Sequence, residues 1–188
     1  MLLPKSCQTL MATNGCEVRA NYQHGLRWGA GIELQGGDGH VVAHNECRDD
    51  LCAIKCAGTT GARVERNRYE TRWVGIHLFE ASGTLCYRNR ASDTMRAVDV
   101  EGGRDNRVEK QLVESCDTGV VIEGGAAGTV VSESWLHDCR VGLLVWGAGP
   151  ATFDRVAVSE PREHAVVADA RLDVAGVELG GDVWIRPA

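Results

Sequence analysis

Apolar and polar residues alternate in short blocks along the chain, and the same kind of block returns at a nearly constant interval. Each block is a small residue followed by an apolar–any–apolar triplet, a period of two that is typical of a β-strand. The blocks are GIEL (31–34), AIKC (53–56), GIHL (75–78), AVDV (97–100), GVVI (119–122), GLLV (142–145) and AVVA (165–168). Their first residues lie 22 or 23 positions apart, and one further step back reaches a weaker copy at Thr9.

A second motif follows most of these blocks: an apolar residue and, three positions later, a side-chain amide. It occurs at 18–21, 42–45, 64–67, 86–89 and 108–111, and glycine-rich turns separate the two motifs. A period of 20 to 50 residues built from strand-like segments indicates a solenoid, because one such unit cannot bury its apolar face alone. The sequence therefore predicts a single all-β domain over residues 1–188.

The pattern G-I-x-L followed by V-x-x-N at a spacing of 22 residues resembles the right-handed parallel β-helix repeats of pectate-lyase-like proteins. It is most similar to the NosD-type repeats of carbohydrate-binding proteins and sugar hydrolases. The resemblance covers about residues 9–180. It implies a single right-handed parallel β-helix of about eight coils of 22–23 residues. These coils are expected to start near residues 9, 31, 53, 75, 97, 119, 142 and 165.

In such a solenoid the first and third residues of each triplet point inward and stack on their equivalents, with neighbouring coils about 4.8 Å apart. We expect Asn21, Asn45, Asn67 and Asn89 to form a ladder. Each amide would bond its equivalent or the local backbone, at a turn where asparagine tolerates the left-handed conformation.

The middle residue of each triplet then points outward. Down the stack it is Glu33, Lys55, His77 and Asp99, followed by the apolar Val121, Leu144 and Val167. Side chains on adjacent coils should lie about 5 Å apart. An aspartate beside a histidine raises the histidine pKa and orients the ring, while a nearby lysine opposes the shift. Glu33, Lys55, His77 and Asp99 are therefore candidate catalytic residues.

Aromatic and charged residues flank this column. Rings stack on sugar faces, and arginine pairs with uronate carboxylates, so we expect a saccharide or another small-molecule ligand. The candidate substrate-binding residues are Arg72, Arg96, Trp28, Trp73, Phe79, Glu101 and Trp146.

Two function classes follow. The first is a lyase or C5-epimerase acting on an acidic or extended saccharide, in which His77 or Lys55 abstracts the proton, Asp99 orients His77, and Arg72 or Arg96 neutralises the uronate. The second is a non-catalytic scaffold, or a sugar-binding or assembly module, with stacked opposite charges serving as a solvated ladder. The regular spacing of 22–23 residues leaves no room for a long loop that would wall a deep cleft.

The resemblance implies a base together with a cation that neutralises the substrate carboxylate. The chain carries no paired-Asp cluster, no Asp-Pro-His segment and no acidic calcium cage. We therefore expect no metal site and no cofactor, with a divalent cation such as calcium as the alternative.

The composition of the chain limits which classes of partner it can bind. The 20 Lys and Arg against 26 Asp and Glu give a net charge of −6, which argues against nucleic-acid binding. No stretch approaches ~18 apolar residues, so no membrane span is expected. The N-terminus lacks the apolar segment of a secretory signal, so we expect a cytoplasmic protein, or an extracellular one if the chain is a fragment.

The 23 glycines suit a fold of short strands and tight turns. Open β-helix ends call for neighbouring domains or a homo-oligomer.

Eight cysteines fit neither a zinc knuckle nor a dense disulfide framework. Cys56 and Cys86 fall at inward positions and should behave as small hydrophobes. Reduced thiols are expected in a cytoplasm. In an oxidising compartment, Cys116 and Cys139 would be the pair to bridge, because they are 23 residues apart at equivalent positions. The other histidines (His24, His40, His44, His137 and His164) are expected in turns.

Overall fold

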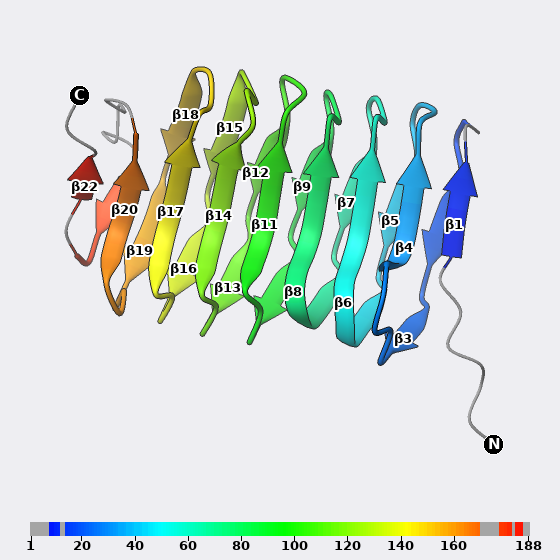
Figure 1. Cartoon of the computed structure of the whole chain (residues 1–188), viewed down its shortest axis with the longest axis horizontal. Helices are drawn as coiled ribbons and strands as arrows, with labels where there is room; N and C mark the ends of the chain where they lie inside the picture. Colours follow the sequence, from blue (N-terminus) through cyan, green and yellow to red (C-terminus); the bar gives the residue numbers. More distant parts are fainter. Residues whose placement is uncertain (1–7, 12–13, 170–176, 182, 186–188) are drawn as a thin grey trace.

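The chain winds into a rod of stacked coils, shown in a computed structural model in Figure 1, with the N-terminal coil at one end and the C-terminal coil at the other. The structure describes residues 8–11, 14–169, 177–181 and 183–185. Strands of neighbouring coils pair in parallel along the rod. The predicted all-β solenoid is confirmed, with about seven complete turns where about eight were expected, since seven strands line one side of the coil.

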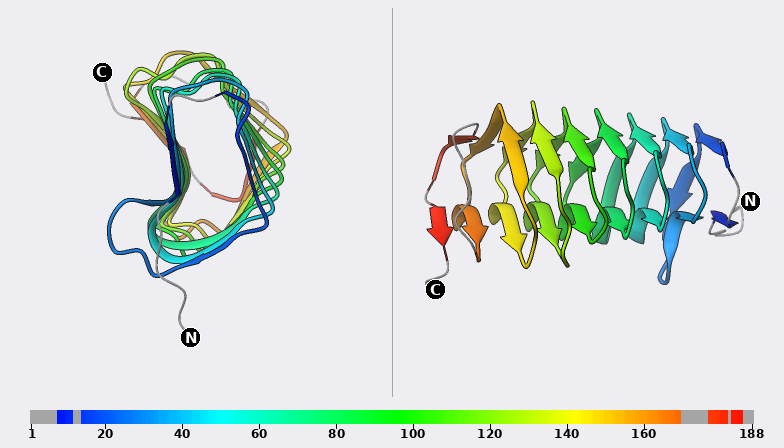
Figure 2. Two further views of the ribbon diagram at one scale, coloured as in Figure 1. Left: turned by 90° about the vertical axis from the view of Figure 1, so that its right-hand side faces the viewer. Right: turned by 90° about the horizontal axis from the view of Figure 1, so that it is seen from above.

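Each coil has three faces, and the end-on view in Figure 2 shows the closed outline that they make. The first face holds the GIEL-type triplets. Its strands are β1 (Gln8–Met11), β4 (Ala30–Gln35), the second half of β6 (Glu46–Ala57), the second half of β8 (Arg68–Phe79), β11 (Arg96–Glu101), β14 (Thr118–Glu123), β17 (Val141–Trp146), β20 (His164–Ala168) and β22 (Val183–Ile185).

The second face joins the first through β6 and β8, which run across the corner between the two faces as single strands of 12 residues each. Its other strands are β3 (Tyr22–His24), β10 (Arg90–Ser92), β13 (Leu112–Glu114), β16 (Trp135–His137), β19 (Val156–Ser159) and β21 (Val177–Leu179). The third face is a separate sheet of β2 (Glu17–Arg19), β5 (Val41–Ala43), β7 (Arg63–Glu65), β9 (Leu85–Tyr87), β12 (Arg107–Glu109), β15 (Thr129–Ser132) and β18 (Ala151–Asp154).

The first coil differs from the expected repeat. Thr9 pairs with Glu33 rather than with Gly31, so the weak first copy is two residues out of step with the prediction. The cause lies in the loop between β3 and β4, where the chain makes an extra excursion that appears as the blue bulge in the end-on view of Figure 2. Asn21 and Asn45 are consequently 24 residues apart, whereas Asn45 and Asn67 are 22 apart.

A row of asparagines lines the corner between the third and second faces. The side-chain N–H of Asn45 donates to Oδ1 of Asn67 at 3.0 Å, and the Asn45 backbone N–H donates to the same oxygen at 2.9 Å. Asn21 bonds Asn45 and Asn67 bonds Asn89 in the same way. We expected the asparagines themselves to adopt the left-handed conformation, and they do not. That conformation falls one position earlier, for example at Arg66 and Arg88 with φ near 54° and 53°.

The core is a set of like-on-like stacks inside the rod. The inward triplet residues Ile32, Ile54, Ile76, Leu34 and Leu78 have no exposed surface. The larger core residue Tyr69 enters from the second face and packs beside Gly75. With the inside filled by these stacks, the side chains that can meet a ligand are the outward ones.

Candidate functional site

The outward column of the first face has the register expected from the sequence. Glu33 pairs with Lys55, Lys55 with His77, and His77 with Asp99 across adjacent strands. The column continues through Val121, Leu144 and Val167 to Trp184 on β22. Four ionisable residues therefore occupy four consecutive coils, and the face becomes apolar toward the C-terminal end.

The charged half of the column is internally paired. Lys55 Nζ lies 3.8 Å from a carboxylate oxygen of Glu33 and 5.4 Å from the centre of the Phe79 ring. Gln35 donates a side-chain hydrogen bond of 3.0 Å to the same Glu33 oxygen. Lys55 is thus held by an anion and by a ring face together, so its charge is paired within the protein.

The partner of His77 is not the one expected. His77 Nε2 lies 2.9 Å from a carboxylate oxygen of Glu101, which is two residues beyond Asp99 on the neighbouring strand. Asp99 instead accepts a hydrogen bond of 2.7 Å from Arg96, which also donates to Glu123 at 2.7 Å. Arg96, which the sequence placed as a binder of uronate, therefore bridges two carboxylates of the protein itself.

Asp99 is almost completely buried although it points outward, with 2% of its surface exposed. Burial raises its pKa, and the hydrogen bond and charge of Arg96 partly oppose that rise. Its Oδ1 atom has no hydrogen-bond partner. A carboxylate this enclosed stabilises Arg96 in place and does not reach a ligand at the surface.

A second outward row runs beside this column. Phe79, Glu101, Glu123 and Trp146 are register partners on four successive strands. The two rings are each 38% exposed, and the two carboxylates lie between them. The Phe79 ring also makes an edge contact with His77 at 5.8 Å between ring centres. These four residues, with His77, form what we call the ring-and-carboxylate row.

Three predicted binding residues lie elsewhere, at the corner near the first coils. Trp28 is on the β3–β4 loop and is 84% exposed, and Trp73 on β8 is 44% exposed. The Arg72 guanidinium donates to the carbonyl oxygens of Leu26 at 2.6 Å and Asp49 at 3.2 Å, so it ties the loop to the rod. A polar hollow of about 250 Å³ adjoins it, lined by His24, Gly25, Arg27, Asp49 and Arg72. His77 does not line this hollow.

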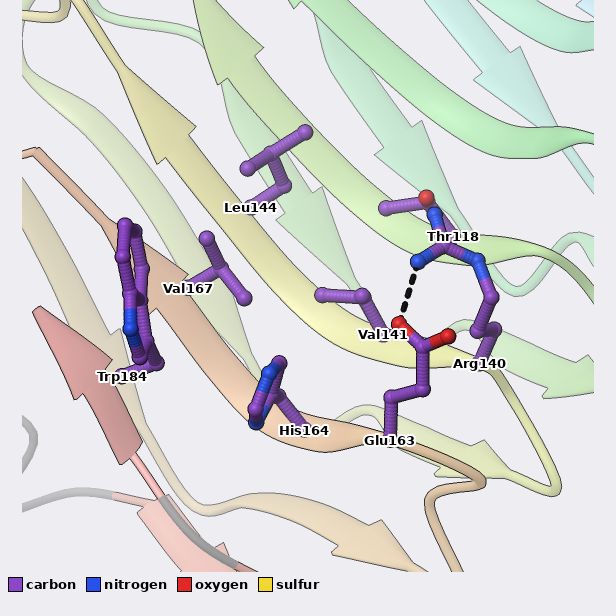
Figure 3. Close-up of a pocket in the computed structure, with 8 residues that line it drawn as sticks. All are labelled: Thr118, Arg140, Val141, Leu144, Glu163, His164, Val167 and Trp184. Carbon is purple, nitrogen blue, oxygen red and sulfur yellow. Dashed lines mark hydrogen bonds and ion pairs between the residues drawn. The ribbon is translucent and has the colours of Figure 1, made fainter. Parts of the chain in front are cut away.

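Sequence reasoning missed a second hollow, of about 300 Å³, at the C-terminal end of the first face (Figure 3). We call it the end hollow. Its lining is Thr118, Arg140, Val141, Leu144, Glu163, His164, Val167 and Trp184. Trp184 stands at one edge and the Arg140–Glu163 pair at the opposite edge, with the three aliphatic residues between them. The sequence did carry one signal for this hollow, the change of the outward column from charged to apolar residues at Val121, Leu144 and Val167. This change leaves a surface without charges at that end of the face.

The remaining histidines and the cysteines also differ in part from expectation. His24, His137 and His164 lie in strands β3, β16 and β20, so the prediction of turns is wrong for them. Among the described residues the cysteines are free thiols, and six of them are buried, including Cys116 and Cys139. The described residues contain no grouping of three or more His, Cys, Asp or Glu side chains suited to a metal ion.

Comparison with known proteins agrees with this geometry. Residues 7–158 match the sequence model described as the right handed beta helix region. The chain belongs to the right-handed β-helix family. A comparison with curated proteins finds no significant match. No helix within the described residues has the length and apolar character to cross a membrane.

Two solved structures show a distant similarity to the chain. One is the catalytic domain of a GH87 α-1,3-glucanase in complex with nigerose, with 9% identity and a TM-score of 0.38 over 95% of this chain and 60% of that one. Another is QnrB1, a plasmid-mediated fluoroquinolone resistance protein, with 11% identity and a TM-score of 0.27 over 93% of this chain and 91% of that one. The chain spans about 60% of the glucanase domain, and likenesses at this level concern the fold alone.

Proposed function

We propose that this β-helix protein binds an extended, uncharged saccharide along the ring-and-carboxylate row. The observation that carries the proposal is the order of the row, with exposed rings at Phe79 and Trp146 and carboxylates at Glu101 and Glu123 between them. Aromatic rings pack on the apolar faces of sugars, and carboxylates accept hydrogen bonds from hydroxyl groups. Three coil steps of about 4.8 Å separate the rings by about 14 Å, a span for several sugar units.

The charges of this face favour an uncharged ligand over the acidic one that the resemblance suggested. Four carboxylates (Glu33, Asp99, Glu101 and Glu123) share the face with two cationic side chains (Lys55 and Arg96), an excess of two negative charges when His77 is neutral. Both cations are already paired with these acids. A uronate polymer would meet net repulsion here, whereas a neutral glycan would not.

Titration calorimetry with cellohexaose, xylohexaose and hexagalacturonate tests the proposal. We expect at least one neutral hexasaccharide to bind and hexagalacturonate to bind more weakly. Trp146→Ala and Phe79→Ala should each weaken binding by roughly 2- to 12-fold, the value of one aromatic contact. Trp28→Ala, an exposed ring at the far corner, is the matched control. Absence of binding to all three sugars, or an equal loss in Trp28→Ala, would contradict the proposal.

One observation favours a second candidate, lyase or C5-epimerase chemistry. The 2.9 Å contact between His77 Nε2 and Glu101 is the arrangement in which a carboxylate holds an imidazole ring for proton transfer. His77 would remove the C5 proton of a uronate. In the lyase reaction the C4–O bond then breaks and a C4=C5 double bond forms. In the epimerase reaction a proton returns to the opposite face of C5.

Ultraviolet absorbance of the unsaturated product distinguishes this candidate from simple binding. Uronate polymers are incubated with the native chain, with His77→Ala and with Glu101→Gln. Turnover that both variants abolish supports catalysis at His77. Incorporation of solvent deuterium at C5 reports the epimerase reaction in the same samples. Absence of product and of deuterium with every polymer leaves binding as the function of this face.

A further inference from the structure

The end hollow differs from the ring-and-carboxylate row in both lining and shape. Its floor is made by the outward side chains of Val141, Leu144 and Val167 on β17 and β20. Trp184, 41% exposed, is the register partner of Val167 on the next strand and walls one edge. The volume of about 300 Å³ is at the lower end of the range for small-molecule sites.

The charged lining of the hollow is one base and one acid, Arg140 and Glu163, and a second acid, Asp117, pairs with Arg140 from outside the lining. Arg140 donates two hydrogen bonds to the Asp117 carboxylate, at 2.7 and 3.1 Å, and one to Glu163 at 2.5 Å. One guanidinium is therefore shared by two carboxylates. The next ion pair outward, Arg162 with Asp138 at 3.6 Å, is balanced. The wall as a whole keeps an excess of one negative charge when His164 is neutral.

We propose that the end hollow binds a small organic cation, a quaternary ammonium group carried on an apolar body. An ammonium charge over the face of a tryptophan is attracted by the ring quadrupole, and tryptophan is the strongest ring for this contact. The methyl groups of such a ligand would lie on the aliphatic floor, and its charge would offset the excess on the Glu163 side. An anion would be repelled by the excess negative charge on the Glu163 side. A polar neutral ligand would leave the aliphatic floor without an apolar partner.

This site does not depend on saccharide binding at the ring-and-carboxylate row. Its ligand is defined by charge and shape, so two molecules of the same shape and different charge separate the contributions. Choline and 3,3-dimethylbutan-1-ol are such a pair, since they differ at the central atom, nitrogen in one and carbon in the other.

The experiment is a calorimetric titration of the full chain with each molecule at about pH 8 in low salt. We expect choline to bind at least about 10-fold more tightly than its neutral isostere. Trp184→Ala should weaken choline binding by roughly 2- to 30-fold, the range of a cation–π contact, and Trp184→Phe by less. Glu163→Gln should lower the preference for choline without weakening binding of the isostere. Trp28→Ala, an exposed ring on the β3–β4 loop outside the hollow, should leave both unchanged.

Two results would overturn the inference. One is equal binding of choline and the isostere, which would make the hollow an apolar site with no charge selection. The other is absence of choline binding to a native chain whose circular dichroism shows the folded β-structure. Circular dichroism of each variant separates a lost contact from a lost fold. Trp184→Phe keeps the comparison available if Trp184→Ala does not fold.

Discussion

Replacing Gly75 with alanine tests how the one large core residue is accommodated. A methyl group at Gly75 would overlap the ring of Tyr69 and lie 2.5 Å from the carbonyl oxygen of Ala97. The register-equivalent positions on the neighbouring coils are already alanines, Ala53 and Ala97, so the coil backbone accepts a methyl group there. At Gly75 the methyl group conflicts with the Ala97 carbonyl oxygen and, most closely, with Tyr69, which is fully enclosed and cannot turn away.

The size of the effect follows from two opposing contributions. Overpacking of a filled core costs about 3 kcal/mol when a ring must move. The lower entropy of the unfolded chain with alanine returns about 0.4 to 1 kcal/mol. The net loss is about 2 kcal/mol of unfolding free energy, or roughly 4 to 8 °C in melting temperature for a domain of this length.

Urea denaturation followed by circular dichroism measures this loss. Gly31→Ala is the matched control, because its methyl group would lie 3.1 Å from the nearest atoms, and we expect a change within about 1 kcal/mol. In a Tyr69→Ala background the cost of Gly75→Ala should fall, with only the conflict with the Ala97 carbonyl remaining. If Gly75→Ala is as stable as Gly31→Ala, or costs the same with and without Tyr69, the steric argument is wrong.

Three further predictions concern buried polar groups. Asn67→Ala removes the hydrogen-bond partners of the Asn45 amide groups and of the Val42 carbonyl. The free energy of unfolding should fall by about 2 to 4 kcal/mol in the same denaturation assay. Asn21→Ala, at the less buried end of the row, should lower it by less. Burial raises the pKa of Asp50, so unfolding free energy should fall as pH rises from about 4 through the folded pKa. Asp50→Asn keeps an acceptor for the Leu26 N–H and should make that fall smaller, with the contribution of Asp99 remaining, and an unchanged pH profile would refute it. Burial raises the pKa of Cys47 and Cys56 to about 12, so mass spectrometry after iodoacetamide at about pH 8 should find both unmodified until the chain is unfolded.

The coil period and the facing of each residue could be predicted from the sequence, because stacking forces equivalent positions into register. The pairing of Glu33, Lys55, His77 and Asp99 across strands follows from that period alone. Which partner each side chain selects does not. His77 reaches diagonally to Glu101 because Arg96 already holds Asp99, and this choice depends on side-chain lengths and rotamers that a repeat pattern does not contain.

The tryptophan wall of the end hollow could not be predicted from the sequence for a related reason. Val167 and Trp184 are only 17 residues apart, which is shorter than a coil, yet they pair on adjacent strands. A search for a 22-residue period cannot bring them together. The same holds for the first coil, where two extra residues place Thr9 against Glu33.

The uninterrupted strands β6 and β8 bear on how the rod unfolds. They pair through nine residue pairs across two faces without a break in either strand, whereas further along the rod β10–β13 and β11–β14 cover the same two faces as separate strand pairs of three and five residue pairs. In a linear array each coil is stabilised only by its neighbours, so local opening spreads from the weakest junctions. The pairing of β6 with β8, in which neither strand breaks at the corner, is therefore expected to open last. Amide hydrogen exchange should therefore be slowest there, and the C-terminal coils with the end hollow should exchange before the charged column does.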